Sequence, residues 1–314
     1  MLIYLKPLSI FPELHSDTLF GAITYAISEL YPEKIDEMIE SFKSEPPFII
    51  SSTFPFIFNN TRKIKFYPKI IFPHKSKDLN EKFLPKDFKD YKKVKFIEEG
   101  LFFDLLKGKL NENDILRNYN HYTSVKGLLM KNSDDIDFNF GENIIPNNSV
   151  NSITNETEGI FYTSGNEFRN MGLFFLIEFA NEEYRPIIKA AMKFLKDRGF
   201  GRDISTGKGH FDYSIEDEYS INQYDGNYFV TLSRFIPNSD DLAHINEFAS
   251  YEIDSKRGKS SSNEIRKQVR FFKEGSVFPD YKKYYGRIVQ SGKVNPAIEY
   301  GFAFPLKCRL EEEE

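Results

Sequence analysis

The 314-residue chain contains no tryptophan, a single cysteine (Cys308) and only five histidines. One thiol cannot form an intramolecular disulfide or a multi-cysteine metal site, so disulfide scaffolds, thiolate zinc sites and iron–sulfur clusters are excluded. Long hydrophobic runs are also missing. The longest, 172–179, is interrupted by Glu178 and is far shorter than the ~18–20 residues that a membrane span requires. These absences predict a cytoplasmic protein with no membrane partner.

What is present is typical of a folded protein. Hydrophobic residues make up 40% of the chain, and at roughly 100–200 residues per domain its length predicts two packed cores. The first nine residues have no basic region ahead of their apolar side chains, and Lys6 and Pro7 break the apolar run. We therefore expect a first strand at this end rather than a targeting leader.

The net charge is −5, which by itself disfavours a nucleic-acid partner. The charge is unevenly distributed, however. Segments 62–95, 185–208 and 256–273 carry +8, +5 and +6, so the rest of the chain carries −24. This segregation predicts electropositive surfaces on an acidic body. Solvated helix faces are the alternative for any single cluster, and they are favoured for 82–95, where lysines alternate with aspartates.

Hydrophobic periodicity predicts the elements of the N-terminal part. The helix over 182–198 has the clearest pattern, with Glu182 and Glu183 in its first turn and Gly199 as its C-terminal cap. The region 46–155 is punctuated by Pro, Lys and Asn and is expected to be a long insertion, with a short helix at 98–107. Without it, the order is βαββαβ, a ferredoxin-like arrangement. The other expected elements are strands at 2–6, 158–162, 170–180 and up to about 214, a turn around Gly165, a helix at 19–30 with its cap at 16–18, and a helix at 33–42.

After an acidic linker, 216–218, the pattern partly repeats, with strands from 227, 251 and 297, a capped helix at 239–248 and a basic strand pair within 265–278. We therefore predict an α+β fold of tandem ferredoxin-like βαββαβ units, the second degenerate, each with one open sheet face. The expected domains are residues 1–214, with the insertion at about 46–155, and residues 215–314.

A loop rich in glycine and cations follows the helix that ends at 198. Glycine allows positive φ and close approach of the backbone, so successive N–H groups can converge on an anion, and a phosphate is the expected occupant. The loop lies between a helix and a strand, the reverse of the order in P-loop and dinucleotide-binding folds. A flexible connector is the alternative. The loop contains Gly199, Gly201, Arg202, Ser205, Thr206, Gly207, Lys208 and Gly209.

This loop, 199–211, resembles the glycine-rich loop of RAMP proteins, the tandem ferredoxin-like RNA-binding subunits of CRISPR effector complexes. The segment 15–23, His-Ser-Asp-Thr-Leu-Phe-Gly-Ala-Ile, is similar to the helix start of one RAMP branch, the fourth Csm subunits of type III-A complexes. Segments 151–162 and 273–278 also resemble that branch. An Asp-Arg pair expected in the branch is replaced here by Asn151-Ser152, which removes a charged contact.

The resemblance implies a non-catalytic RNA-binding subunit for antiviral defence. Such a subunit holds the 5′ repeat-derived handle of the CRISPR RNA (crRNA) and bridges the large polymerase-like subunit to the backbone RAMP subunit, the third Csm subunit. It implies no cofactor, metal or catalytic residue. The expected RNA-binding residues are His15, Ser16, Arg198, Gly199, Gly201, Arg202, Ser205, Thr206, Gly207, Lys208, Gly209, Arg257 and Lys259.

Single-stranded RNA also stacks its bases on aromatic rings. Without tryptophan, stacking must come from Phe or Tyr. Phe200 and Phe211 are candidates, although a place in the core is the favoured interpretation for both.

Two other functions stay open. A CRISPR repeat-processing endoribonuclease would use His15 as general base or acid, whereas a histidine that merely flanks a helix start is the favoured interpretation. Asp17 is expected to cap that helix rather than to support metal-dependent cleavage. A protein-bridging scaffold whose basic segments face acidic partners is the third possibility.

Overall fold

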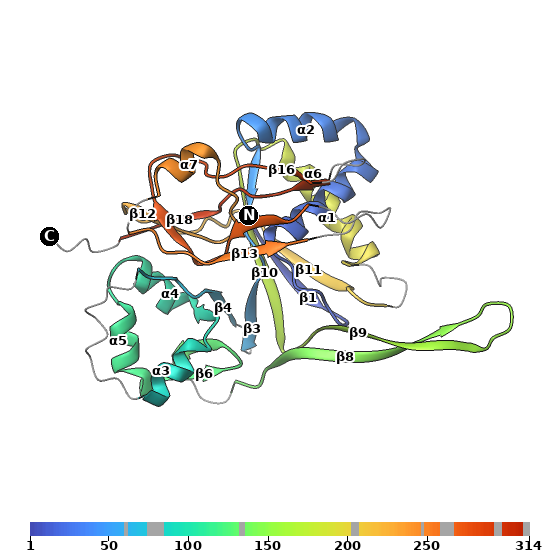
Figure 1. Ribbon diagram of the computed structural model, residues 1–314, viewed down its shortest axis with the longest axis horizontal. Helices are drawn as coiled ribbons and strands as arrows, with labels where there is room; N and C mark the ends of the chain where they lie inside the picture. Colours follow the sequence, from blue (N-terminus) through green and yellow to red (C-terminus); the bar gives the residue numbers. More distant parts are fainter. Residues whose placement is uncertain are drawn as a thin grey trace.

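The computed structural model describes residues 1–59, 62–73, 85–131, 136–201, 207–245, 248–257, 267–291 and 297–309. Figure 1 shows helices and strands mixed around one large sheet, with a long hairpin projecting from the body. The α+β class predicted from the sequence is confirmed.

The large sheet has nine strands in the order β11-β1-β10-β3-β4-β5-β7-β6, and β2 also pairs with β10. β1 lies between β10 and β11 and is antiparallel to both. The strands β1 and β10 are apolar at nearly every position, and both faces of each strand are buried. The strands are β1 (Leu2–Pro7), β2 (Phe48–Ile50), β3 (Phe54–Asn59), β4 (Arg62–Pro68), β5 (Phe96–Glu98), β6 (Tyr122–Val125), β7 (Leu128–Lys131), β10 (Met171–Phe179) and β11 (Phe211–Glu216).

One face of the sheet packs against α1 (Ser16–Leu30), α2 (Pro32–Ser44) and α6 (Tyr184–Arg198). All three helices lie close to the ranges that the hydrophobic periodicity predicts. The α6 helix ends at Gly199, whose φ of 89° and N–H bond of 2.6 Å to the Leu195 carbonyl confirm the predicted cap.

The opposite face of the sheet is covered, contrary to the expectation of an open face. Tyr67 stacks on Phe102 of α4 (Glu99–Leu106) at 4.8 Å, and Tyr4 is 5% exposed. Removing large aromatic side chains from water is favourable, and α4 with its neighbouring elements covers those on this face. The other helices of the predicted insertion are α3 (Pro85–Lys92), inside the lysine-rich segment, α5 (Glu112–Arg117) and the turn η2 (Tyr119–His121).

The predicted insertion is not separate from the sheet, because β2 and β3 both pair with β10. The segment 158–162, expected as a sheet strand, lies instead in β9 (Thr157–Arg169), which pairs with β8 (Asn139–Val150) to form the projecting hairpin. The turn predicted at Gly165 is also wrong. A Cβ there would lie 2.3 Å from a methyl carbon of Ile10, so this glycine permits a close approach within a strand.

The C-terminal part forms small sheets. β12 (Tyr228–Thr231) lies between β15 (Val277–Pro279) and β18 (Pro305–Cys308). The helix α7 (Ser239–Ala243) has a capping box of Asn238 and Asp241, and it ends earlier than the predicted 239–248. A second ferredoxin-like unit and the boundary at 214–215 stay predictions. The remaining pairs are β13 (Ile253–Lys256) with β14 (Val269–Phe272), and β16 (Val289–Ser291) with β17 (Ala297–Glu299).

Candidate functional site: a polar clasp and a glycine loop

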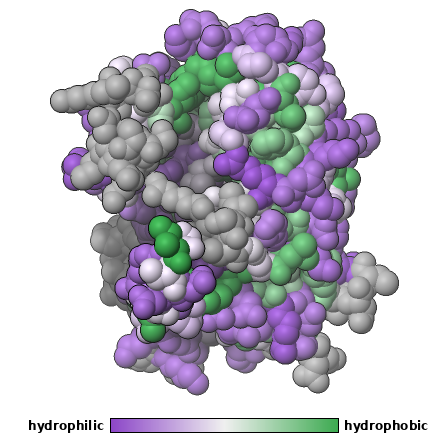
Figure 2. All heavy atoms as spheres, turned by 90° about the vertical axis from the view of Figure 1, so that its right-hand side faces the viewer, coloured by the Kyte–Doolittle hydropathy of each residue, from purple (hydrophilic) through white to green (hydrophobic). Residues whose placement is uncertain are grey.

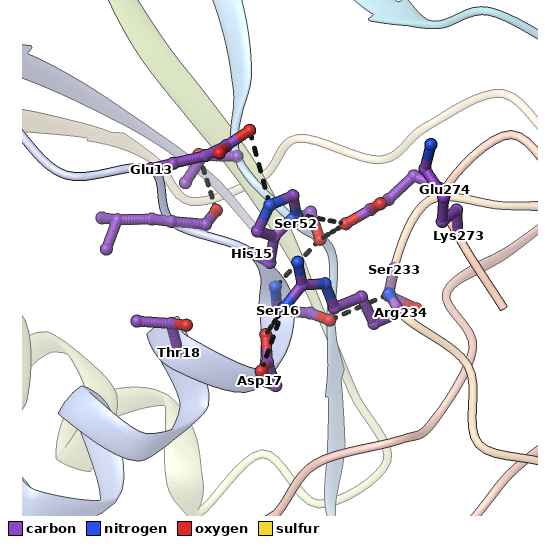
Figure 3. A network of polar contacts seen from close by, with 12 residues as sticks. Glu13, His15, Ser16, Asp17, Thr18, Ser52, Ser233, Arg234, Lys273 and Glu274 are labelled. Carbon is purple, nitrogen blue, oxygen red and sulfur yellow. Dashed lines mark hydrogen bonds and ion pairs between the residues drawn. The ribbon is translucent and has the colours of Figure 1, made fainter. Parts of the chain in front are cut away.

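The start of α1 meets the C-terminal part of the chain in a network of polar side chains (Figure 3). Two of the sequence motifs that carry the family resemblance, 15–23 and 273–278, come together here. We call the six ionisable residues of this network the clasp: Glu13, His15, Asp17, Arg234, Lys256 and Glu274.

His15 lies between two carboxylates. Its Nδ1 is 2.8 Å from Oε1 of Glu274, and its Nε2 is 3.4 Å from Oε1 of Glu13. Ser52 donates its hydroxyl to the same oxygen of Glu274 and accepts the backbone N–H of Ser16 at 2.9 Å. The Ser16 hydroxyl in turn accepts the backbone N–H of Arg234 at 3.0 Å. The first turn of α1 is thus tied to both the sheet and the C-terminal part.

These contacts fix the charge of the imidazole. Burial by itself disfavours the charged form, but the hydrogen bonds with Glu13 and Glu274 outweigh it and raise the pKa of His15 to about 9. At neutral pH the ring is therefore an imidazolium, which has no lone pair with which to accept a proton. The geometry does not favour His15 as a general base.

The raised pKa of His15 predicts a pH dependence of stability. Because the ordinary value is about 6.5, the contribution to the free energy of unfolding is complete below about pH 6.5 and is lost as the pH rises through about 9. Chemical denaturation at several pH values should show the excess stability of wild type over His15→Gln shrinking across this range, by up to roughly 3 kcal/mol. A constant difference from pH 6 to 10 would contradict the assignment.

Asp17 does not cap the helix, which corrects the sequence-based expectation. The N-terminal position of α1 is His15, with no side-chain cap. Instead, Oδ1 of Asp17 lies 3.1 Å from Nη1 of Arg234, and Oδ2 lies 2.6 Å from Nζ of Lys256. The Asp17 side chain is only 6% exposed, and these two cations, acting against burial, hold the pKa of its carboxyl below the ordinary range. A buried carboxylate needs cations more than helix N–H groups, and the C-terminal part supplies them.

The charges of the clasp compensate one another. Three carboxylates face the imidazolium, one guanidinium and one ammonium, and a further carboxylate, that of Glu299, lies 3.8 Å from Lys256. Arg234 also lies 4.2 Å over the ring of Phe271. Because the clasp has no surplus positive charge, it offers little electrostatic attraction to RNA phosphates. Its contacts span sequence separations of more than 200 residues, so the clasp acts as a structural link between the two parts of the chain.

The glycine loop runs beside the segment that precedes α1. Gly209 donates its N–H to the Ile10 carbonyl at 2.8 Å, and Phe200 donates to the Gly209 carbonyl at 2.9 Å. Gly199, Gly201, Gly207 and Gly209 all have positive φ, between 73° and 106°. The loop backbone therefore adopts conformations that other residues rarely adopt, as its composition predicts.

The two aromatic residues of the loop lie in the core. Phe200 and Phe211 stack with ring centroids 4.9 Å apart, and both contact Phe11 edge-on. Their exposed fractions are 4% and 1%. The structure confirms the core position that the sequence favours for both rings.

The cations of the predicted RNA site differ in their surroundings. The guanidinium of Arg198 lies 4.1 Å over the ring of Tyr25, and Arg257 is exposed. The ammonium of Lys208 contacts Thr163 and lies 3.5 Å from Oδ1 of Asn147, which ties the loop to the β8–β9 hairpin. Four predicted residues, Arg202, Ser205, Thr206 and Lys259, lie outside the described ranges.

A cleft of about 460 Å³ opens beside His15, between the start of α1 and segments 68–72, 92–96 and 273–274. Lys69 forms part of its wall, with its ammonium 3.6 Å over the Tyr91 ring, and burial lowers the pKa of this lysine. Other lysines and glutamates alternate around the cleft, so its walls are of mixed charge. No local sequence pattern predicts this cleft, because its walls come from distant parts of the chain.

The residues of the clasp from the C-terminal part were also missed. Glu274 falls in a segment singled out by resemblance, but no local pattern names His15 as its partner. Arg234 belongs to none of the three basic segments. Within the described ranges, no group of three His, Cys, Asp or Glu side chains is placed to hold a metal ion. No helix in the same ranges is long and apolar enough to cross a membrane.

Comparisons with known proteins support the family resemblance of the N-terminal motif, the glycine loop and segment 273–278. A family model described as the CRISPR Csm4 C-terminal domain matches residues 224–308. A curated relative, the CRISPR system Cms protein Csm4 of Thermococcus onnurineus (strain NA1), is 25% identical over 308 residues, which cover 95% of this chain and 92% of the relative.

Solved structures share the fold. A chain of the Csm3-Csm4 subcomplex of the type III-A CRISPR-Cas interference complex matches with a TM-score of 0.68 and 21% identity, over 97% of this chain and 98% of that one. A chain of the Csm1-Csm4 cassette in complex with AMPPNP matches with a TM-score of 0.60 and 21% identity, over 99% and 98%. The match of the C-terminal domain model and the similarity along nearly the full length of a curated Csm4 make this chain similar to Csm4 proteins of CRISPR systems.

Proposed function

We propose that this chain is a non-catalytic subunit of a Csm effector complex that holds the 5′ handle of the crRNA on its glycine loop. The observation that carries the proposal is the backbone of this loop, where four glycines have positive φ beside a lysine and an arginine. Such a backbone can turn several N–H groups toward one phosphate. Arg198, Arg202 and Lys208 add the positive charge that phosphates require.

His15 and Ser16 enter the proposal as supports. Their side chains are engaged by Glu274 and by the backbone of Arg234, so they hold the start of α1 in place beside the loop. Arg257 and Lys259 would extend the RNA path across the C-terminal part. The covered sheet face leaves the loops and edges as the RNA surface.

We infer further that the chain is a tandem ferredoxin-like protein. The order β11-β1-β10-β3, with α1 after β1 and α6 after β10, supports a first βαββαβ unit. In this unit the glycine loop connects the second helix to the last strand. The second unit is proposed on the partial repetition of the pattern after residue 227.

The proposed partners are the backbone RAMP subunit and the large polymerase-like subunit. Support comes from the matching structures, whose complexes pair Csm4 with Csm3 and with Csm1. No catalytic step is proposed, because both ring nitrogens of His15 face carboxylates, those of Glu13 and Glu274.

A double charge reversal tests the loop. Arg202→Glu with Lys208→Glu should weaken binding of the purified chain to a single-stranded RNA that carries the 5′ repeat-derived handle. It should also lower the salt slope by about 0.7 for each lost phosphate contact, so by roughly 1.4 in all. Affinities measured from 50 to 300 mM salt give both numbers.

The matched control reverses two exposed lysines elsewhere, Lys89 in α3 and Lys109 after α4. We expect the control to change net charge equally and to leave the salt slope nearly unchanged. An equal loss of affinity and slope in both double variants would show a general charge effect and would contradict the loop as the phosphate site.

A further inference from the structure

The exposed side of α1 carries a tyrosine beside the end of α6. Tyr25 is 38% exposed, and the guanidinium of Arg198, the last residue of α6, lies 4.1 Å over its ring. The ring of Phe194, one turn earlier in α6, is centred 6.3 Å from that of Tyr25. Guanidinium groups and aromatic rings both provide flat surfaces on which unpaired bases stack. The Arg198–Tyr25 pair therefore presents a stacking surface directly before the glycine loop.

The charge around this pair favours an anionic partner. Within the described part of the chain, the Arg198 guanidinium makes no ion pair with a carboxylate. Residues 193–202 contain four lysines and arginines and one aspartate. Figure 2, which views the side of Figure 1 on which α1 and α6 lie, shows hydrophobic side chains among hydrophilic ones. RNA supplies both groups that such a surface suits, a base for the ring and phosphates for the cations.

A glycine one turn before Tyr25 keeps the same side of α1 open. Gly21 is exposed and is the sixth of the 15 residues of the helix. Glycine inside a helix is destabilising relative to alanine, so its presence needs a reason. In the described ranges, no atom beyond the adjoining helix backbone lies within 4 Å of the place that a Cβ would take. Packing within this chain does not require the glycine, and the open space suits a strand that passes over α1.

We propose that one unpaired base of the bound RNA stacks on the Arg198–Tyr25 pair while the strand passes over Gly21. The proposal rests on the RNA-binding function proposed above and adds the residues that hold a base. Thr18, one turn before Gly21, lies 3.4 Å from the Lys256 ammonium, so this side of α1 leads from the glycine loop toward the C-terminal part. The exposed side of α1 thereby joins the loops and edges as RNA surface.

The first test separates the ring from mere exposure. Tyr25→Leu should weaken binding of the full chain to a single-stranded RNA with the 5′ repeat-derived handle by about tenfold. Tyr25→Phe keeps the ring and should rescue the affinity to within about twofold of wild type. The salt slope should stay at the wild-type value in both variants, because neither removes a phosphate contact.

The matched control is Tyr281→Leu. Tyr281 is 37% exposed, and the Lys282 ammonium lies 5.1 Å from its ring, but its stacking partner is His244, after α7. We expect the control to bind handle RNA like wild type. Equal losses of affinity in Tyr25→Leu and Tyr281→Leu would overturn the proposal, because any exposed tyrosine would then have the same effect.

RNAs that lack one base at a time identify the stacked base. With the wild-type chain, loss of that base should weaken binding by about tenfold. With Tyr25→Leu, loss of the same base should cost nothing further, because the contact is already gone. Additive losses at every position of the handle would overturn the stacking.

Gly21→Leu tests the path of the strand independently of the ring. Leucine favours a helix more than glycine does and meets no neighbour here, so the melting temperature should rise. The affinity for handle RNA should nevertheless fall by about fivefold or more, because the base can no longer approach the ring. Gly100→Leu is the control, since Gly100 is an exposed glycine of α4 with nothing within 4 Å of its Cβ position. Gly21→Leu that binds like Gly100→Leu would overturn the proposal.

The outcomes also separate this proposal from the function on which it rests. If Tyr25→Leu binds like wild type while Arg202→Glu with Lys208→Glu weakens binding, the stacking is overturned and the glycine loop stands. A wild-type chain that does not bind handle RNA overturns both. If Tyr25→Leu keeps its RNA affinity but loses a neighbouring subunit from the purified assembly, the surface contacts protein and the proposal is overturned.

Discussion

Asp17→Ala is expected to lower the free energy of unfolding by about 3–5 kcal/mol, because removal of one partner from a buried ion pair leaves an uncompensated charge. The lost carboxylate faces the guanidinium of Arg234, whose side chain is 12% exposed, and the ammonium of Lys256. Guanidinium denaturation followed by circular dichroism measures the loss directly.

The control for this variant is Glu29→Ala, which removes an exposed carboxylate from the same helix. We expect a change within about 0.5 kcal/mol there. If Asp17→Ala lost no more stability than Glu29→Ala, the clasp would not link the two parts of the chain. Wild-type stability with impaired RNA cleavage would point instead to the metal-dependent role that the sequence left open.

Gly209→Ala should be the most damaging single substitution in the glycine loop. A Cβ at this position would lie 1.7 Å from the Phe200 carbonyl oxygen, a backbone atom that cannot move without breaking the loop. Gly207→Ala is the matched control, since its φ is also positive, at 82°, but nothing lies within 4 Å of its Cβ. The control should cost roughly 1–2 kcal/mol from backbone strain alone, and Gly209→Ala clearly more.

Melting curves and handle-RNA affinity should separate these two variants. We expect Gly209→Ala to lower both the melting temperature and the affinity, because the Phe200–Gly209 contact shapes the loop. Equal effects of the two variants would mean that only positive φ matters and that the close backbone approach has no role.

Local patterns predicted the regular elements well. The helices α1, α2 and α6 and the strands β1, β10 and β11 lie close to their expected ranges, because each has a clear periodicity or an apolar run. The second strand of the predicted βαββαβ unit was misassigned to 158–162, whereas β3 lies beside β10 in the sheet. The short β2 and β3 lie in a proline-containing segment with weak alternation, and the β9 segment has the stronger β-type pattern. The partner of β9 is β8, which no local pattern identifies.

The candidate site was predictable in part for the same reason. The glycine loop is a local feature, and its positive φ values follow from composition. The partners of His15 and Asp17 are 259 and 217 residues away in the sequence, so no spacing rule finds them. The assignment of Asp17 as a cap failed because sequence rules describe the helix end in isolation, whereas burial against Arg234 decides the role of this carboxylate.

The clasp and the glycine loop are compatible with the proposed assembly subunit. Buried ion pairs hold the two parts of the chain together, and the proposed RNA contacts fall to the loop and the exposed cations.

The most direct test of the central claim is purification of this chain with the subunits encoded beside it, followed by sequencing of the 5′ ends of any bound small RNA. We expect a complex that contains the backbone RAMP subunit and RNA whose 5′ ends are repeat-derived handles. Recovery of the assembled protein without RNA, or with RNA that lacks the handle, would contradict the proposed function.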